Sequence, residues 1–153
     1  MKKITDDVIY IGVDDLDIDL FESQYKVPQG ISYNSYLILD EKVAILDTAD
    51  ARKGEEWEEN LSKALGERQP DFLVVHHLEP DHSSMIAKVL EKYPKIQVVT
   101  GVRSVKMLSQ FFDTPDIATR CIEMKEGDLL DLGKHKLRFY AAPMVHWPEV
   151  MVS

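Results

Sequence analysis

The sequence has a single cysteine and no long apolar run, and both features limit the class of protein. Cys121 is the only cysteine among 153 residues, so no disulfide can form within the chain, which fits a reducing compartment. No apolar stretch is long enough to span a bilayer, and the start, MKKITDDVIY, carries charges where a signal peptide would have its apolar segment. We therefore expect a cytoplasmic protein that has no membrane partner.

Positive charge is also scarce. Acidic side chains outnumber basic ones by 27 to 18, and the formal net charge is −9. Because no run of lysine or arginine interrupts this excess, the sequence argues against nucleic acid as a partner. A phosphate loop of the G-x-x-x-x-G-K type is missing as well, which argues against nucleotide hydrolysis.

The composition that remains is that of an ordinary folded domain. Hydrophobic residues make up 44% of the chain and charged residues 29%, which excludes a disordered or fibrous class. A length of 153 residues is typical of one domain, so we expect a single domain over residues 1–153.

The order of apolar patterns predicts an α/β fold. Runs of branched and aromatic residues predict strands at 8–13, 35–40, 42–48, 71–77, 96–101, 121–124, 128–132 and 136–143. Helical spacing of apolar residues predicts helices at 55–67, 83–93 and 102–112. A β meander followed by alternating strands and helices is typical of a layered α/β sandwich. Since the final residues read as a strand that has only begun, we expect the chain to be the first part of a longer domain.

The stretch VVHHLEPDHSSM concentrates histidines and carboxylates directly after an apolar strand. His77 and Glu79 are two positions apart, so in extended backbone they project to the same side, while His76 and Leu78 project to the other. This alternation predicts that two potential metal ligands converge at the carboxyl end of a strand, where α/β folds commonly bind ligands.

Two further donors, Asp81 and His82, follow where the next helix begins, after Pro80, which stiffens the loop. A purely structural interpretation is also open: Asp81 would be a helix N-cap, and Glu79 would form a surface ion pair with one histidine. Because all four donors occur together at this spacing, we favour a metal site.

The pattern H-x-E-x-D-H resembles the metal motif of the metallo-β-lactamase superfamily, whose zinc hydrolases have histidine at the position of Glu79. A carboxylate makes the site harder and more negative, which favours iron over zinc. The glutamate form resembles the flavodiiron proteins, and so do the segments VPQGISYNSYLILDEKVAILDT and AAPMVHWPEVMVS. The resemblance implies an αββα sandwich, of which this chain would hold the amino-terminal half to two thirds.

The same resemblance implies a set of ligands. His77, Glu79 and His146 would bind one iron, and Asp81 and His82 would bind the second. In the family, a bridging aspartate, a later histidine and a flavodoxin-like domain with flavin mononucleotide (FMN) follow, and this chain ends before all three. The two irons of a complete site would therefore be only partly ligated by these residues.

The implied function is reduction of dioxygen to water or of nitric oxide to nitrous oxide, as in oxygen detoxification, with electrons from a rubredoxin-like donor. Two alternatives remain. One is a noncatalytic, self-associating module; open strand edges favour pairing of chains, so we expect a homodimer. The other is a zinc-dependent hydrolase of the same superfamily.

Four residues outside the motif have more than one interpretation. Asp47, at a strand end, could support the metals or form a turn. Trp147 could line the site or pack in the core. His76 is expected to face away from the site, and His135, in the turn GKHK, is expected to face solvent. The acidic run DDLDID is expected to be a solvated loop.

Overall fold

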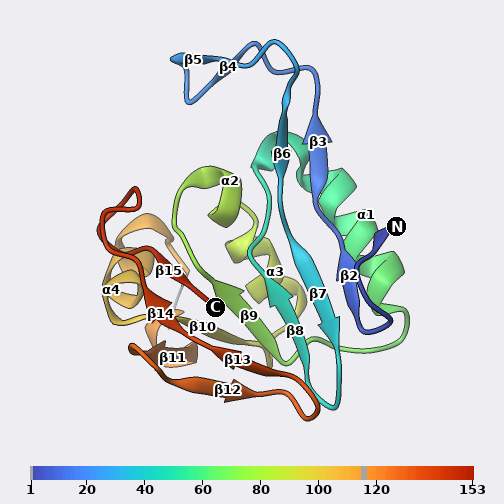
Figure 1. The fold of residues 1–153 in the computed structure, drawn as a ribbon, viewed down its shortest axis with the longest axis vertical. Helices are drawn as coiled ribbons and strands as arrows, with labels where there is room; N and C mark the ends of the chain where they lie inside the picture. Colours follow the sequence, from blue (N-terminus) through green and yellow to red (C-terminus); the bar gives the residue numbers. More distant parts are fainter. Residues whose placement is uncertain (1, 115–116) are drawn as a thin grey trace.

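The computed structural model describes residues 2–114 and 117–153, and a seven-stranded sheet forms its centre (Figure 1). In spatial order its strands are β1 (Lys2–Lys3), β2 (Val8–Tyr10), β7 (Tyr36–Leu39), β8 (Val43–Leu46), β9 (Phe72–Val75), β10 (Gln97–Gly101) and β11 (Cys121–Met124). The first four pair antiparallel, as the predicted meander requires. From β8 to β11 the pairing is parallel, so the carboxyl ends of β9 and β10 lie at the same edge of the sheet.

Parallel strands need crossover connections, and these connections supply the helices. The helices are η1 (Ala51–Lys53), α1 (Gly54–Leu65), α2 (Pro80–Ser83), α3 (Ile86–Lys92), α4 (Val102–Phe111) and η2 (Ile117–Arg120). Within residues 2–114 and 117–153, none of them has the length and apolar character needed to cross a bilayer.

Two apolar cores lie on opposite faces of the sheet. Strand β9 is buried along its whole length: Leu73 and Val75 belong to the core under the helices, and Phe72 and Val74 belong to the second core. This explains why its sequence reads as a continuous apolar run rather than an alternating one. Trp57 of α1 is the largest fully buried side chain of the helical core.

The second core is covered by the final part of the chain. The strands β12 (Leu129–Asp131), β13 (Lys136–Arg138), β14 (Tyr140–Ala141) and β15 (Met151–Val152) form two antiparallel pairs, β12–β13 and β14–β15. Leu130 of β12, Met151 of β15 and Phe139, which lies between β13 and β14, are buried in this core. A helical layer, a central sheet and a partial second β layer result, which confirms the predicted α/β sandwich.

A narrow arm, residues 16–30, projects from the sheet at the top of Figure 1. It carries β4 (Leu20–Phe21) paired with β5 (Tyr25–Lys26), and it connects β3 (Val13–Asp15) to β6 (Ile31–Tyr33). The expectation that the acidic run DDLDID, residues 14–19, is a solvated loop is wrong for Asp15. Asp15 is buried and accepts hydrogen bonds from the Tyr33 hydroxyl at 3.0 Å and from the Arg52 Nε at 2.9 Å.

The helix predicted at 83–93 is divided into α2 and α3. Pro80 occupies the first turn of α2, where its missing N–H is tolerated, so helical structure begins earlier than expected. The division falls at Ser84 and Met85, and the backbone N–H of Met85 lies 3.3 Å from the Thr48 hydroxyl instead of extending the first helix.

The expectation for His135 is met only in part, because its side chain is 32% exposed but is held against the sheet. Its ring Nδ1 lies 2.7 Å from Asp40 Oδ2, and its backbone N–H donates to the same oxygen at 2.6 Å. Asp40 is buried, and its turn between β7 and β8 lies against the turn between β12 and β13. His135 therefore joins the second β layer to the central sheet.

Replacing Asp40 with asparagine should destabilise the chain near neutral pH, and this effect should become smaller in acid. Burial would raise the pKa of Asp40, but hydrogen bonds from the backbone and ring of His135 and from the backbone of Glu41 outweigh burial and hold that pKa well below its usual range. A lowered pKa adds stability above the unfolded pKa of about 4, and this stability is lost as the pH falls through the folded pKa. The Tm of the wild type should exceed that of D40N at about pH 6, and the difference should shrink as the pH falls from about 4 to about 2. An undiminished difference in acid would contradict this assignment.

Candidate metal centre

The centre is built from two loops at one edge of the sheet. One continues from the carboxyl end of β9 through His77 and Glu79 into α2. The other connects β14 to β15 and carries His146. The backbone N–H of Met151 donates to the His76 carbonyl oxygen at 3.0 Å and joins the two loops.

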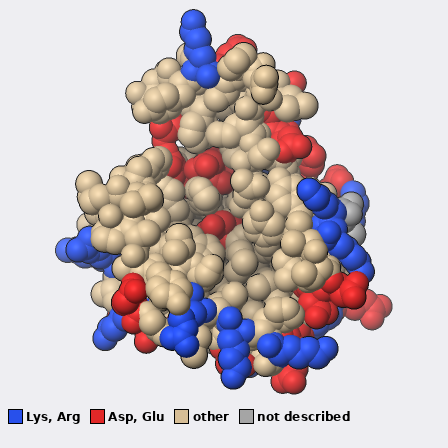
Figure 2. All heavy atoms as spheres, in the orientation of Figure 1, with Lys and Arg blue, Asp and Glu red and all other residues tan. Residues whose placement is uncertain are grey.

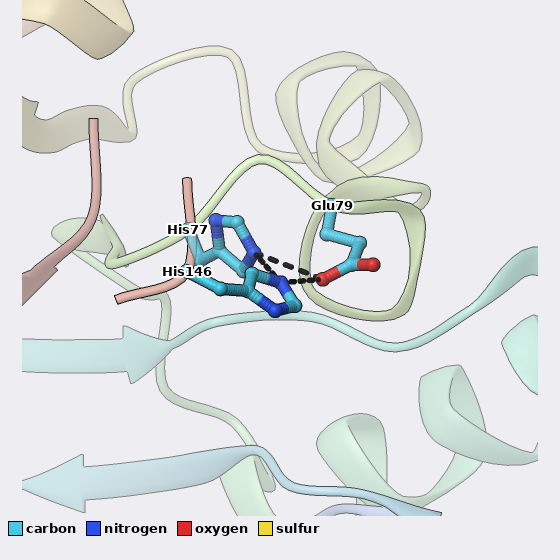
Figure 3. Close-up of side chains that lie close together, drawn as sticks. All are labelled: His77, Glu79 and His146. Carbon is cyan, nitrogen blue, oxygen red and sulfur yellow. Dashed lines mark hydrogen bonds and ion pairs between the residues drawn. The ribbon is translucent and has the colours of Figure 1, made fainter. Parts of the chain in front are cut away.

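Three side chains converge between these loops. Nε2 of His77 lies 2.9 Å from Glu79 Oε2, and Nε2 of His146 lies 2.7 Å from the same oxygen. The two histidine nitrogens are 3.2 Å apart, and the close-up shows both rings directed at one carboxylate oxygen (Figure 3). One ligand atom from each residue lies within 4.8 Å of the other two, so one metal ion could contact all three.

The chemistry of these donors fits a metal ion. His77 and Glu79 are buried, whereas the His146 side chain is 63% exposed, so the triad is open on one side. The second carboxylate oxygen of Glu79 is buried and makes no hydrogen bond to any residue that the structure describes. A buried carboxylate oxygen without a donor is costly, and a bound cation would compensate for it.

A cavity of about 290 Å³ opens beside the triad. Glu79 and Asp81 line one wall, and Leu20 and Phe21 of the arm line another. Figure 2 shows acidic side chains recessed in a hollow below the arm. The cavity therefore gives a small molecule access to the side of the centre that Glu79 and Asp81 form.

The other two predicted ligands, Asp81 and His82, lie beside the triad but do not converge with it. Among the described residues, only His77, Glu79 and His146 form a potential metal-binding group. Nε2 of His82 lies 3.5 Å from Asp81 Oδ2, and its Nδ1 lies 3.3 Å from Asp47 Oδ2. The pKa of Asp81 is raised by burial. Burial would lower the pKa of His82, but the hydrogen bond and charge of Asp47 outweigh it and raise that pKa.

Asp47 directly follows β8, and its carboxylate contacts the rings of His76 and His82; its support of the metals stays a prediction. Its backbone adopts a left-handed conformation with φ of 54°, which suits a turn. Its carboxylate accepts from the His76 backbone N–H at 2.7 Å and lies 3.0 Å from the His76 ring. Burial would raise the pKa of Asp47, but the charge and hydrogen bond of His76, followed by those of His82, lower it. The prediction that His76 faces away from the triad is confirmed.

The structural interpretation of Asp81 as an N-cap is not supported. The N-cap residue of α2 is Glu79, and its side chain makes no capping hydrogen bond. The Trp147 ring stands edge-on to the His77 ring, with centroids 5.2 Å apart, so Trp147 does line the centre.

Glu149 is a member of the centre that the sequence analysis missed. Its carboxylate lies 2.7 Å from Nδ1 of His77, on the side of the ring opposite Glu79. The segment HWPE contains it, three residues after His146, and this short spacing was the available indication.

Comparisons with known proteins agree with this fold. The family model described as ODP family beta lactamase matches residues 31–153. The chain is 36% identical over 140 residues to diflavin flavoprotein A 1 of Synechocystis sp., which covers 91% of this chain and 24% of that protein. It is 32% identical over 152 residues to flavo-diiron protein FprA2 of Clostridium acetobutylicum, covering 99% of this chain and 38% of that protein.

A solved structure agrees as well. Rubredoxin oxygen:oxidoreductase from Desulfovibrio gigas superposes with a TM-score of 0.88 at 30% identity, over 98% of this chain and 37% of that one. The chain thus spans between 24% and 38% of the length of these three proteins. The family match covers most of the chain and includes every residue of the triad, so this chain belongs to the ODP family of β-lactamase-like proteins and is a relative of the flavodiiron proteins.

Proposed function

We propose that the chain is the iron-binding part of a flavodiiron-type oxidoreductase, which reduces dioxygen to water or nitric oxide to nitrous oxide. The observation that carries this proposal is the buried Glu79 carboxylate between His77 and His146. A carboxylate in place of a third imidazole favours a hard, highly charged ion, so iron fits better than zinc. The relatives named flavo-diiron protein and rubredoxin oxygen:oxidoreductase support the same chemistry.

In this proposal, His77, Glu79 and His146 hold one iron, and Asp81 and His82 contribute to the second. Asp81 offers a buried oxygen that has no hydrogen-bond partner among the described residues. His82 lies against Asp47, and its ring centroid is 5.3 Å from that of His77, so the two histidines lie side by side in the centre. Residues 1–153 would form a single metallo-β-lactamase-like domain or the first part of one.

When bound, a pair of irons supplies one-electron chemistry and two adjacent positions for a diatomic molecule. The residues of this chain supply geometry and charge rather than acid or base chemistry. Glu79 contributes negative charge in a buried position, which stabilises the more oxidised metal. Leu20 and Phe21 contribute apolar surface to the cavity that Glu79 and Asp81 line.

The proposed partners follow from the relatives. One relative from Vibrio vulnificus is named anaerobic nitric oxide reductase flavorubredoxin, and the chain is 32% identical to it over 152 residues, which span 30% of that protein. We propose a rubredoxin-like electron donor, FMN as the electron carrier, a homodimer as the assembly, and a cytoplasmic location.

The metal content of chain purified without oxygen tests this function. We expect iron in excess of zinc by elemental analysis, because the triad includes a carboxylate. The matched variant E79H should shift the preference towards zinc, because its third donor becomes an imidazole. Tightly held zinc in the wild type, with hydrolysis of esters or amides, would instead favour the zinc hydrolase. A chain that binds neither metal would favour the noncatalytic module.

A further inference from the structure

The Glu149 carboxylate lies on the outer side of the His77 ring, away from the triad. Its Oε1 atom lies 2.7 Å from Nδ1 of His77, while Nε2 on the other side of the same ring faces Glu79. The Glu149 side chain is fully buried, so water does not compete for this contact. A metal ion at Nε2 would require that nitrogen to be unprotonated, so the ring proton would lie on Nδ1, where the Glu149 carboxylate accepts it.

The same carboxylate oxygen also holds the backbone. Oε1 of Glu149 accepts a hydrogen bond from the Leu78 N–H at 3.1 Å, next to the ligand-bearing residue His77. Glu149 comes from the loop between β14 and β15, which also carries His146. One side chain therefore joins the segment that carries His77 and Glu79 to the segment that carries His146.

We propose that Glu149 is the positioning residue of the metal centre: it fixes the proton of His77 on Nδ1, aims Nε2 at the metal, and sets the spacing between the two ligand loops. The inference rests on the metal centre proposed above. Glu149 lies opposite the ligand positions and acts through His77. Carboxylates behind metal-bound histidines act in this way in metal sites generally, and their loss lowers metal affinity by about 10- to 100-fold.

Two substitutions of Glu149 distinguish the effect of its hydrogen bonds from the effect of its packing. E149Q keeps an oxygen that can accept from both the His77 ring and the Leu78 N–H, whereas E149L fills similar space and accepts from neither. The matched control is D40N, since Asp40 also accepts from a histidine Nδ1 at 2.7 Å and from a backbone N–H, but at the remote His135. D40N should change stability and leave metal affinity unaltered.

The first measurement uses the metal-free wild-type chain. In ¹H–¹⁵N spectra, Nδ1 of His77 should carry a proton that exchanges slowly with water, because it is buried and hydrogen-bonded to Glu149. E149Q should retain this proton, and E149L should lose its protection. A wild-type Nδ1 with no protected proton would overturn the proposal, whether or not E149L folds.

The second measurement is the affinity for Co(II), with binding detected by the absorption spectrum of the bound ion. E149L should bind Co(II) about 10- to 100-fold more weakly than the wild type, and E149Q should recover most of that loss. Equal affinities for E149L and the wild type would overturn the proposal. If the wild type binds Co(II) but not iron, the proposed oxidoreductase function fails while the positioning role of Glu149 stands.

Discussion

Replacing His77 with alanine should lower the affinity for Fe(II) by more than about 100-fold, since loss of a direct ligand should exceed the effect of losing an outer partner. His77 is the only triad member with a short contact to both other members and to Glu149. Its removal would also leave the buried Glu79 and Glu149 carboxylates without their shared partner. Calorimetric titration of each variant with Fe(II), without oxygen, would measure the change in affinity.

The adjacent His76 provides the control. Its ring lies between Asp47 and the Ser153 hydroxyl, at 3.0 Å and 2.8 Å, and it takes no part in the triad. H76A and H77A remove the same side chain from neighbouring positions, so any general effect of histidine loss is shared by both. If H76A lowered Fe(II) affinity as much as H77A, the triad would not be the primary metal site.

The convergence of His77 and Glu79 could be predicted from the sequence because it is local. Both residues follow one strand, and side chains two positions apart in extended backbone share a side whatever the rest of the fold does. His146 is different, since it lies 69 positions after His77 along the chain. Only its resemblance to a family segment identified it, because spacing over such a distance carries no geometric information.

The residues that the sequence analysis missed or misjudged depend on contacts between distant segments. Glu149 meets His77 across 72 positions, and His135 meets Asp40 across 95. A histidine in a polar turn is expected to be exposed when only its neighbours in sequence are considered. Packing of the second β layer on the sheet places the Asp40 carboxylate beside the His135 ring. The residues next to His135 in the sequence do not indicate this contact.

The second large effect that we expect is on stability. Replacing Arg120 with methionine should reduce the free energy of unfolding by about 3 kcal/mol. Arg120, at the end of η2, donates from Nη1 to the Leu90 carbonyl at 3.0 Å, and from Nη2 to the carbonyls of Tyr93 at 2.9 Å and Ile96 at 3.0 Å. These carbonyls lie at and after the carboxyl end of α3, where helical partners run out. Urea unfolding of wild type and R120M would measure the loss.

Arg138 supplies the comparison for this prediction, because among the described residues its guanidinium makes one hydrogen bond, an exposed one of 3.3 Å to the Gly127 carbonyl. Exposed carbonyls regain water when a donor is removed, so R138M should change the free energy of unfolding by no more than about 0.5 kcal/mol. Partly buried carbonyls cannot regain water as readily, and this difference underlies the larger loss in R120M. Equal losses in the two variants would mean that Arg120 acts through its charge or bulk and not through the carbonyls that it joins.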